Sequence, residues 1–121
     1  MKKPVIAISS GDPAGIGPEI TVKALADPDV YAQCNPLVAA NAGLIRMAAE
    51  MCELPLEVHA ISDPEEAYYR YGIIDVLEHQ NINLKAFDRG IASAAGGKAA
   101  YDYVRTVIDL AMHNKVTATV T

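Results

Sequence analysis

The sequence predicts an α/β fold in which a parallel or mixed β-sheet carries helices on both faces. Short apolar, β-branched runs alternate with helix-like segments along the whole chain, and no internal repeat or low-complexity linker interrupts them. The chain has 121 residues, of which 51% are hydrophobic, so it is long and apolar enough to bury one core. Because alternating strands and helices build βαβ units, we expect residues 1–121 to form one unit without a separable second domain.

The predicted strands are short apolar runs bounded by proline, glycine, asparagine or aspartate. They cover residues 4–9, 37–40, 56–61, 73–77 and 116–121. The last run is rich in β-branched residues, and we predict it to be a central strand. Residues 78–92 have no strong period and are predicted to be a long connection with one short edge strand near residues 82–84.

Two helices are predicted in the first half of the chain. The first runs over residues 18–26 and ends before Asp27-Pro28, because the residue before a proline resists the helical conformation. The second covers residues 44–52, and Asn41 is its candidate N-cap. Both are mostly apolar, as expected for helices that pack on a sheet.

The longest helix is predicted over residues 94–114, after a short helical turn at residues 63–67. Ser93 is its candidate N-cap, since a serine hydroxyl can accept a hydrogen bond from the first turn. A surface helix turns its apolar stripe toward the core. That stripe consists of Tyr101, Val104, Val107, Ile108, Ala111 and Met112.

The main candidate site is the stretch Gly11-Asp12-Pro13-Ala14-Gly15-Ile16-Gly17-Pro18-Glu19, between the first strand and the first helix. Glycines permit backbone conformations that other residues resist, and α/β proteins bind ligands at the carboxyl ends of strands. The stretch is not the usual dinucleotide fingerprint, because Ile20 stands where the third glycine is needed, and it lacks the Gly-Lys-Ser/Thr of a P-loop. Glu19 suits the helix dipole but would repel a phosphate. A structural turn and a functional loop both remain open, and the acidic residues favour a functional loop.

A second candidate is Ser93-Ala94-Ala95-Gly96-Gly97-Lys98, at the start of the longest helix. Small residues at a helix start can expose backbone N–H groups to an anion, and Lys98 could add positive charge. An ordinary N-cap with a tightly packed first turn explains the same residues. The residues alone favour this second interpretation.

Composition argues against several classes of function. The net charge of −5 and the pI of about 5.0 argue against nucleic acid and anionic membranes as partners. No apolar run approaches the roughly 20 residues of a membrane span, and the apolar run near the N-terminus is too short for a secretion signal, so we expect a cytoplasmic protein. His59, His79 and His113 are isolated in the sequence, so no metal site is predicted within this chain.

Three stretches resemble the 4-hydroxythreonine-4-phosphate dehydrogenase family. The opening motif of the family is similar to residues 8–20, Ile-Ser-Ser-Gly-Asp-Pro-Ala-Gly-Ile-Gly-Pro-Glu-Ile. Its characteristic helix start is similar to residues 93–105, and its next strand is similar to residues 116–121. The resemblance runs through the whole chain and identifies it as the N-terminal portion of a member, with the D-threonate or D-erythronate 4-phosphate dehydrogenase subgroup as an alternative. In two respects the chain departs from the family: Ala40-Asn41 replaces the usual Gly-Asp, and family members extend far beyond Thr121.

This resemblance implies an isocitrate or isopropylmalate dehydrogenase-like fold. It also implies an enzyme that oxidises the secondary alcohol of a phosphorylated hydroxy acid with NAD or NADP. Decarboxylation follows in this family, and a divalent metal polarises the reacting oxygen. The implied substrate is most simply 4-phosphooxy-L-threonine in pyridoxal phosphate biosynthesis, and the implied assembly is a homodimer with the active site at its interface.

The resemblance places the glycine-rich loop at the edge of the active-site cleft, on the cofactor side. The residues assigned to cofactor binding are Gly11, Asp12, Gly15, Gly17 and Glu19. Ser93 and Lys98 are weaker candidates for substrate binding. The family's metal ligands, main phosphate contacts and most of its cofactor pocket are expected beyond Thr121. We therefore expect no catalytic residue and no dehydrogenase activity in the 121-residue chain alone.

A hypothesis from another class remains open: a noncatalytic α/β domain that acts only in ligand binding or assembly. An exposed sheet edge at residues 116–121 would allow pairing with another chain. Binding of NAD or of a phosphorylated hydroxy acid to the chain would help to separate the two hypotheses.

Overall fold

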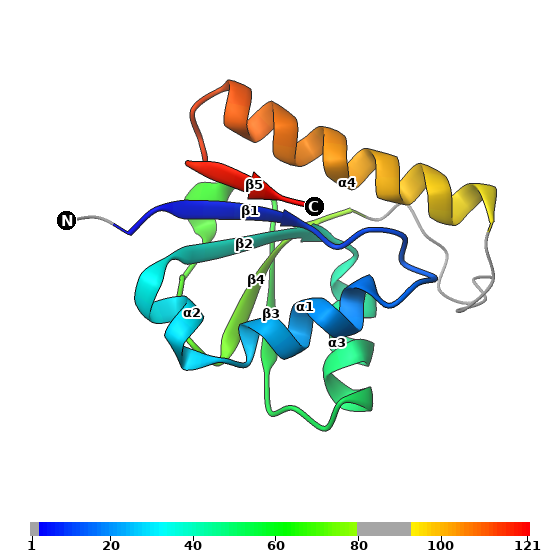
Figure 1. Cartoon of the computed structure of the whole chain (residues 1–121), viewed down its shortest axis with the longest axis horizontal. Helices are drawn as coiled ribbons and strands as arrows, with labels where there is room; N and C mark the ends of the chain where they lie inside the picture. Colours follow the sequence, from blue (N-terminus) through cyan, green and yellow to red (C-terminus); the bar gives the residue numbers. More distant parts are fainter. Residues whose placement is uncertain (1–2, 80–92) are drawn as a thin grey trace.

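The computed structural model describes residues 3–79 and 93–121, which form a five-stranded parallel β-sheet between two helical layers (Figure 1). The strand order is β3-β4-β2-β1-β5, and every neighbouring pair is parallel. The strands are β1 (Val5–Ser9), β2 (Asn35–Ala40), β3 (Glu57–Ile61), β4 (Ile73–Glu78) and β5 (Ala118–Val120). The helices are α1 (Gly17–Leu25), α2 (Pro28–Gln33), α3 (Ala42–Met51) and α4 (Ala94–Met112), with a 3₁₀ turn η1 (Pro64–Glu66). The predicted α/β fold with helices on both faces is confirmed.

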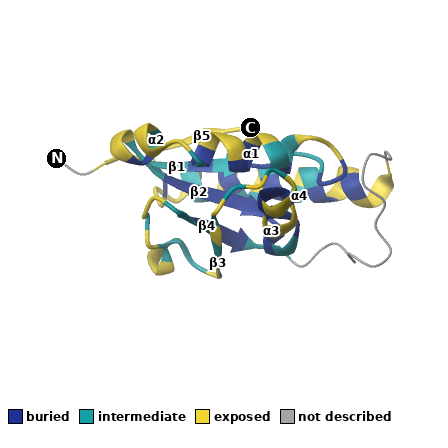
Figure 2. Cartoon of the chain, turned by 90° about the horizontal axis from the view of Figure 1, so that it is seen from below, coloured by how far each residue is buried: buried dark blue, intermediate teal, exposed yellow. Residues whose placement is uncertain are grey.

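Alternate residues of the central strand β2 face opposite sides of the sheet, as the pleat requires. Val38 and Ala40 belong to the core with α1 and α3, whereas Leu37 and Ala39 belong to the core with α4. Figure 2 shows the buried residues concentrated in the central strands and on the inner sides of the helices. Because both faces are covered, β2 is apolar without the polar alternation of a half-exposed strand.

The order of the strands reverses at β1. On one face α1 and α2 lead from β1 to β2, whereas on the other face α4 leads to β5 on the opposite side of β1. Open α/β sheets form a crevice for ligands at the carboxyl ends of the strands where this reversal occurs. The glycine-rich loop after β1 lies at this point.

In the structure β5 is an edge strand, which corrects the prediction of a central strand. It pairs with β1, and all three of its residues are exposed. Within residues 3–79 and 93–121 no strand pairs with its other side. β-Branched residues indicate a strand but not its position, which depends on the other strands of the sheet. The edge strand suggested near residues 82–84 lies outside the described residues.

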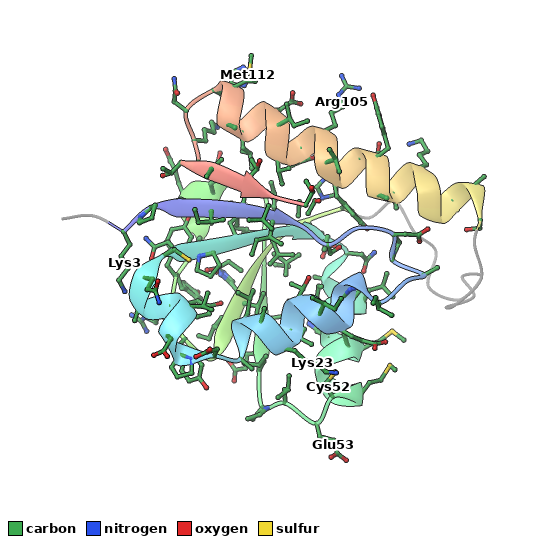
Figure 3. All side chains as sticks on the ribbon, in the orientation of Figure 1. Lys3, Lys23, Cys52, Glu53, Arg105 and Met112 are labelled. Atoms are coloured by element: carbon green, nitrogen blue, oxygen red, sulfur yellow. The ribbon has the colours of Figure 1, made fainter. Side chains whose placement is uncertain are left out.

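The buried face of α4 agrees only in part with the predicted stripe. Its buried residues are Gly96, Ala99, Tyr103 and Val107. Of the predicted stripe, Val107 is buried and Ala111 packs against the core, whereas Tyr101, Ile108 and Met112 are 63%, 50% and 76% exposed. Figure 3 shows Arg105 and Met112 pointing away from the sheet. Because α4 has apolar residues on two faces, the small residues of its first two turns decide which face approaches the sheet.

Asp27-Pro28, interpreted as a helix end, also begins α2, which the sequence did not predict. The Asp27 carboxylate accepts the Asp29 N–H at 2.9 Å, and the missing N–H of Pro28 costs nothing in the first turn. The predicted N-cap of α3 is confirmed, because Asn41 Oδ1 accepts the Leu44 N–H at 3.3 Å. α3 begins at Ala42, two residues before the prediction.

A buried carboxylate holds the connection between β3 and β4. Asp75 is 1% exposed, and its Oδ1 lies 2.8 Å from Nδ1 of His59 on the neighbouring strand. The backbone N–H groups of Tyr68 and Tyr69 donate to the same carboxylate at 3.1 and 2.9 Å. The ring of Tyr68 stacks on His59 with centroids 3.9 Å apart. These contacts fix the connection on the side of the sheet opposite α3.

Candidate functional site

The loop that follows β1 is held in a compact turn by its own hydrogen bonds. Gly11 has a φ of +77°, a conformation that residues with a β-carbon rarely adopt. Asp12 Oδ1 accepts the Ala14 N–H at 2.8 Å, and the Asp12 carbonyl oxygen accepts the Gly15 N–H at 2.9 Å. The loop therefore presents a defined surface at the carboxyl end of β1.

The first turn of α1 packs directly against the end of β1. A β-carbon on Gly17 would lie 1.7 Å from the carbonyl oxygen of Ser10, so only glycine fits there. Ile16 is the N-cap but provides no side-chain hydrogen bond, and Pro18 occupies the first turn. Glu19 adds a carboxylate to the same turn. This negative charge makes the N-terminus of α1 a poor phosphate site, as the sequence indicated.

The same loop contacts the first turn of α4. A β-carbon on Gly96 would lie 2.6 Å from Oδ1 of Asp12, so the carboxylate packs on the glycine itself. The two candidate motifs, far apart in the sequence, thus meet at one edge of the sheet. Sequence reasoning identified both motifs but did not predict this contact.

Ser93 and Lys98 have structural partners within α4. Ser93 Oγ accepts the Gly96 N–H at 3.0 Å, which confirms the ordinary N-cap interpretation. Lys98 Nζ lies 3.3 Å from Oδ2 of Asp102, one turn further along the helix. The Lys98 side chain is 76% exposed. A role in substrate binding stays a prediction for both residues.

Polar side chains that the sequence did not assign to the site lie at the ends of β2 and β4. Asn41 Nδ2 donates to the His79 carbonyl oxygen at 3.3 Å, and Glu78 Oε1 accepts the Ala42 N–H at 3.1 Å. The ring of Tyr103 on α4 meets the His79 ring edge-on, with centroids 5.1 Å apart. Their positions directly after predicted strands were the signal that could have identified Asn41, Glu78 and His79.

Tyr103 is fully buried, and burial together with the negative charges of Glu78, Asp102 and Asp12 raises the pKa of its hydroxyl to about 12. The hydrogen bond with the Asn41 backbone opposes this rise in pKa. Residues from four segments of the chain thus act on one phenol. Tyr103 is a neutral hydrogen-bonding group at ordinary pH.

A mainly apolar cavity of about 320 Å³ adjoins the loop, between α1 and the ends of β1 and β5. Its lining includes Gly11 and Gly17 of the loop, together with Ile20 of α1 and Val120 of β5. The carbon-rich lining and the volume suit one flat ring of a nicotinamide coenzyme, whereas a whole dinucleotide needs more space. The described residues therefore fit part of such a coenzyme.

The described residues do not supply a metal site by themselves. In residues 3–79 and 93–121 no three side chains of histidine, cysteine, aspartate or glutamate are grouped so that they could hold a metal ion. In the same part of the chain, no helix is long and apolar enough to cross a membrane.

A parallel sheet with its glycine loop and a helix start at the point of strand reversal defines an open α/β protein, a class whose ligands bind at the carboxyl edge of the sheet. The family model described as "Pyridoxal phosphate biosynthetic protein PdxA" matches residues 32–121, and the chain belongs to this family. The predicted family resemblance is confirmed.

Individual relatives agree with this assignment. A Halalkalibacterium halodurans protein named "Putative D-threonate 4-phosphate dehydrogenase" is 41% identical over 99% of this chain and 36% of its own length. The crystal structure of a 4-hydroxythreonine-4-phosphate dehydrogenase from Burkholderia phymatum has a TM-score of 0.94 and 38% identity, covering 98% of this chain and 36% of that one. A Klebsiella pneumoniae enzyme with the same name has a TM-score of 0.87 and 30% identity, covering 97% of this chain and 36% of that one.

These relatives are named dehydrogenases, and the chain spans 36% of their length. Their structural similarity is consistent with the predicted isocitrate dehydrogenase-like fold.

Proposed function

We propose that this chain forms the cofactor-side part of a cytoplasmic dehydrogenase that oxidises the secondary alcohol of a 4-phosphorylated hydroxy acid with NAD or NADP. The contact between Asp12 and Gly96 carries the proposal, because it joins the glycine loop and the start of α4 beside an apolar cavity. The names of the relatives support the type of reaction.

In this proposal the loop forms one wall of the cleft, and the coenzyme supplies the hydride acceptor. The residues assigned to the wall are Gly11, Asp12, Gly15, Gly17 and Glu19. The cavity between α1 and β5 offers an apolar surface to one face of a coenzyme ring. Glu19 keeps the coenzyme pyrophosphate away from the start of α1. Ser93 and Lys98 lie on the substrate side.

The whole protein supplies the rest of the site. We assign the divalent metal ligands and the main phosphate contacts to polypeptide that the relatives have and this chain lacks. We also assign a homodimer to the whole protein. The chain alone is expected to be inactive.

A titration with coenzyme tests the assignment of the loop. We expect NAD or NADP to shift the amide resonances of Gly11, Gly15 and Gly17. We expect Asp12→Ala to weaken binding by roughly fivefold or more, because the substitution removes the Oδ1 acceptor that orders the turn. Asp109→Ala, at an exposed position near the other end of α4, is the control. Shifts that avoid the loop, or equal affinities of the two variants, would argue against the assignment.

Two substrates fit the proposal, 4-phosphooxy-L-threonine and D-threonate 4-phosphate. The structural relatives are named for the first and the curated relative for the second. An assay of coenzyme reduction with each substrate and a divalent metal distinguishes them in the whole protein. The same assay on this chain should give no turnover, and a rate like that of a full-length relative would refute this expectation.

A noncatalytic role in assembly is the second candidate, and the exposed edge strand β5 favours it. It predicts concentration-dependent self-association of the chain without coenzyme binding. Sedimentation velocity, together with the coenzyme titration, separates the two candidates.

A further inference from the structure

His79, the residue that follows β4, uses both ring nitrogens to connect the sheet with α4. Nδ1 lies 3.0 Å from the carbonyl oxygen of Leu77, and Nε2 lies 2.8 Å from Oγ1 of Thr106 on α4. The Thr106 hydroxyl also lies 2.9 Å from the carbonyl oxygen of Asp102, one turn earlier in the helix, to which it can donate. The imidazole thus bridges the end of β4 and the middle of α4.

The number of available protons restricts how these three hydrogen bonds can coexist. A carbonyl oxygen only accepts, so Nδ1 must carry a proton to bond with Leu77. Thr106 has a single hydroxyl proton, and if that proton goes to Asp102, Nε2 must donate to Oγ1. All three bonds therefore form together only when the ring carries both protons. When the ring is neutral, the Thr106 proton turns to Nε2, and its bond to Asp102 is lost.

We propose that His79 is a positioning residue whose second proton tightens the attachment of α4 to the sheet and holds the Asp12 loop in place. A charged donor strengthens the bond from Nε2 to Thr106. α4 is one continuous helix, and its first turn provides Gly96, on which the Asp12 carboxylate packs. The significance of this loop for cofactor binding rests on the proposed function, whereas the bonds of His79 do not depend on it.

Acidic groups lie around Tyr103, whose ring meets the His79 ring edge-on. Among the described residues, the carboxylates that act on Tyr103 are Glu78 on β4, Asp102 on α4 and Asp12 in the loop, and no positively charged side chain is among the groups that shift its pKa. Tyr103 itself stays neutral because burial raises its pKa.

Nuclear magnetic resonance of the histidine ring nitrogens in this chain tests the proposal without coenzyme or substrate. As the pH falls from about 8 to about 5, the range in which imidazoles take up a second proton, His79 Nδ1 should remain protonated and Nε2 should gain a proton. Amide exchange of Gly96 and Gly97, corrected for intrinsic exchange rates, should become slower over the same transition. An unprotonated Nδ1 at neutral pH, or protection that does not follow the His79 transition, would overturn the proposal.

Two substitutions of Thr106 separate this role from simple packing. Thr106→Val keeps the shape but removes the acceptor of Nε2, so we expect the slowing of Gly96 and Gly97 amide exchange at lower pH to be lost. Thr106→Ser keeps the hydroxyl and should restore this slowing. The amide exchange of His113, which is exposed at the other end of α4, should respond to pH equally in all three proteins. Gly96 and Gly97 exchange that still follows pH in Thr106→Val would refute the proposal. If Thr106→Val does not fold, the coupling of Nε2 protonation to Gly96 and Gly97 exchange in the wild-type chain still decides the question.

Failure of coenzyme binding and failure of this proposal are distinguishable. The nitrogen resonances report the hydrogen bonds of His79 whether or not the chain binds NAD. Coenzyme binding without the expected Nδ1 proton would refute only the role of His79. The expected proton without coenzyme binding would refute only the assignment of the loop.

Discussion

The carboxylate of Asp12 packs directly on the α-carbon of Gly96, leaving no room for a side chain at residue 96. Asp12 belongs to the loop that joins β1 to α1, and α1 packs on one face of the sheet. Gly96 belongs to the first turn of α4, which packs on the opposite face. The size of residue 96 therefore sets how closely the two parts of the candidate site approach. This relationship can be tested in the chain itself.

Gly96→Ala should push the Asp12 loop away from α4. The new β-carbon would lie 2.6 Å from Asp12 Oδ1, and we expect the free energy of unfolding to fall by about 1–3 kcal/mol, as in other overpacked sites. The amide resonances of Ala14 and Gly15 should shift. The matched control is Gly97→Ala, where no atom lies within 4 Å and the better helix former should add about 0.5–1 kcal/mol. Equal effects of the two substitutions in denaturant titrations would contradict the packing argument.

Gly17→Ala should be more harmful than Gly15→Ala. A β-carbon at Gly17 would overlap the carbonyl oxygen of Ser10 at 1.7 Å, and backbone atoms on both sides must move to relieve the overlap. We expect a loss of about 3 kcal/mol or more. At Gly15 the nearest atom is the Asp12 carbonyl oxygen at 3.3 Å, so about 1 kcal/mol or less is expected. Thermal and denaturant unfolding provide the measurement. A larger loss of stability in Gly15→Ala than in Gly17→Ala would contradict the close packing of α1 against the end of β1.

Asp75→Asn should destabilise the connection between β3 and β4. The substitution removes the charge that His59 and two backbone N–H groups contact in the interior. We expect a loss of about 2–4 kcal/mol, because the partners of a buried charge lose strong hydrogen bonds. Asp63→Asn is the control, since its contact with Lys115 is exposed and 3.8 Å long and asparagine can still accept the Glu65 N–H. A change below about 0.5 kcal/mol is expected. A similar loss in both variants would disprove the special role of Asp75.

Glu53→Gly should stabilise the protein. Glu53 follows α3 with a φ of +56° and points into solvent (Figure 3). Its N–H bonds to the Glu50 carbonyl oxygen, and the Leu54 N–H bonds to that of Ala49, which is the pattern of a helix end that favours glycine. We expect a gain of about 0.5–1 kcal/mol. Glu50→Gly, inside the helix, should instead cost about 1 kcal/mol. A loss in Glu53→Gly would mean that the Glu53 side chain contributes more than its backbone strain costs.

The protein should lose stability in alkali because buried tyrosines resist ionisation. Burial raises the pKa of Tyr103 to about 12, and it also raises the pKa of Tyr31. Between the ordinary tyrosine pKa of about 10 and this higher value, the unfolded chain releases protons that the folded chain keeps, so stability falls as the pH rises. Tyr103→Phe should reduce the slope of unfolding free energy against pH by up to about 1.4 kcal/mol per pH unit. Chemical unfolding measured from about pH 9 to about pH 11.5 checks this, and an unchanged slope would indicate that Tyr103 ionises normally.

Local residues determined most of the secondary structure. Asn41 and Ser93 cap their helices as predicted, because capping depends on residues within one turn. The apolar runs predicted all five described strands for the same reason. Asp27-Pro28 ends the first helix as predicted, but the same pair also begins α2, which was not predicted. The two glycine motifs were also evident from the sequence.

Only the tertiary structure decided how these parts meet. Strand order brings Asp12 to Gly96 and His79 to Thr106, and no local pattern encodes either contact. The face of α4 that packs on the sheet depends on how closely the helix can approach, and the small residues Gly96 and Ala99 permit a close approach. The spacing of the apolar residues alone did not predict this face. β5 lies at an edge because position in a sheet depends on the neighbouring strands, whereas strand formation depends on the residues themselves. The sequence by itself therefore determined all five described strands, most of the helices, the motifs and the family resemblance, and long-range packing determined the site they form together.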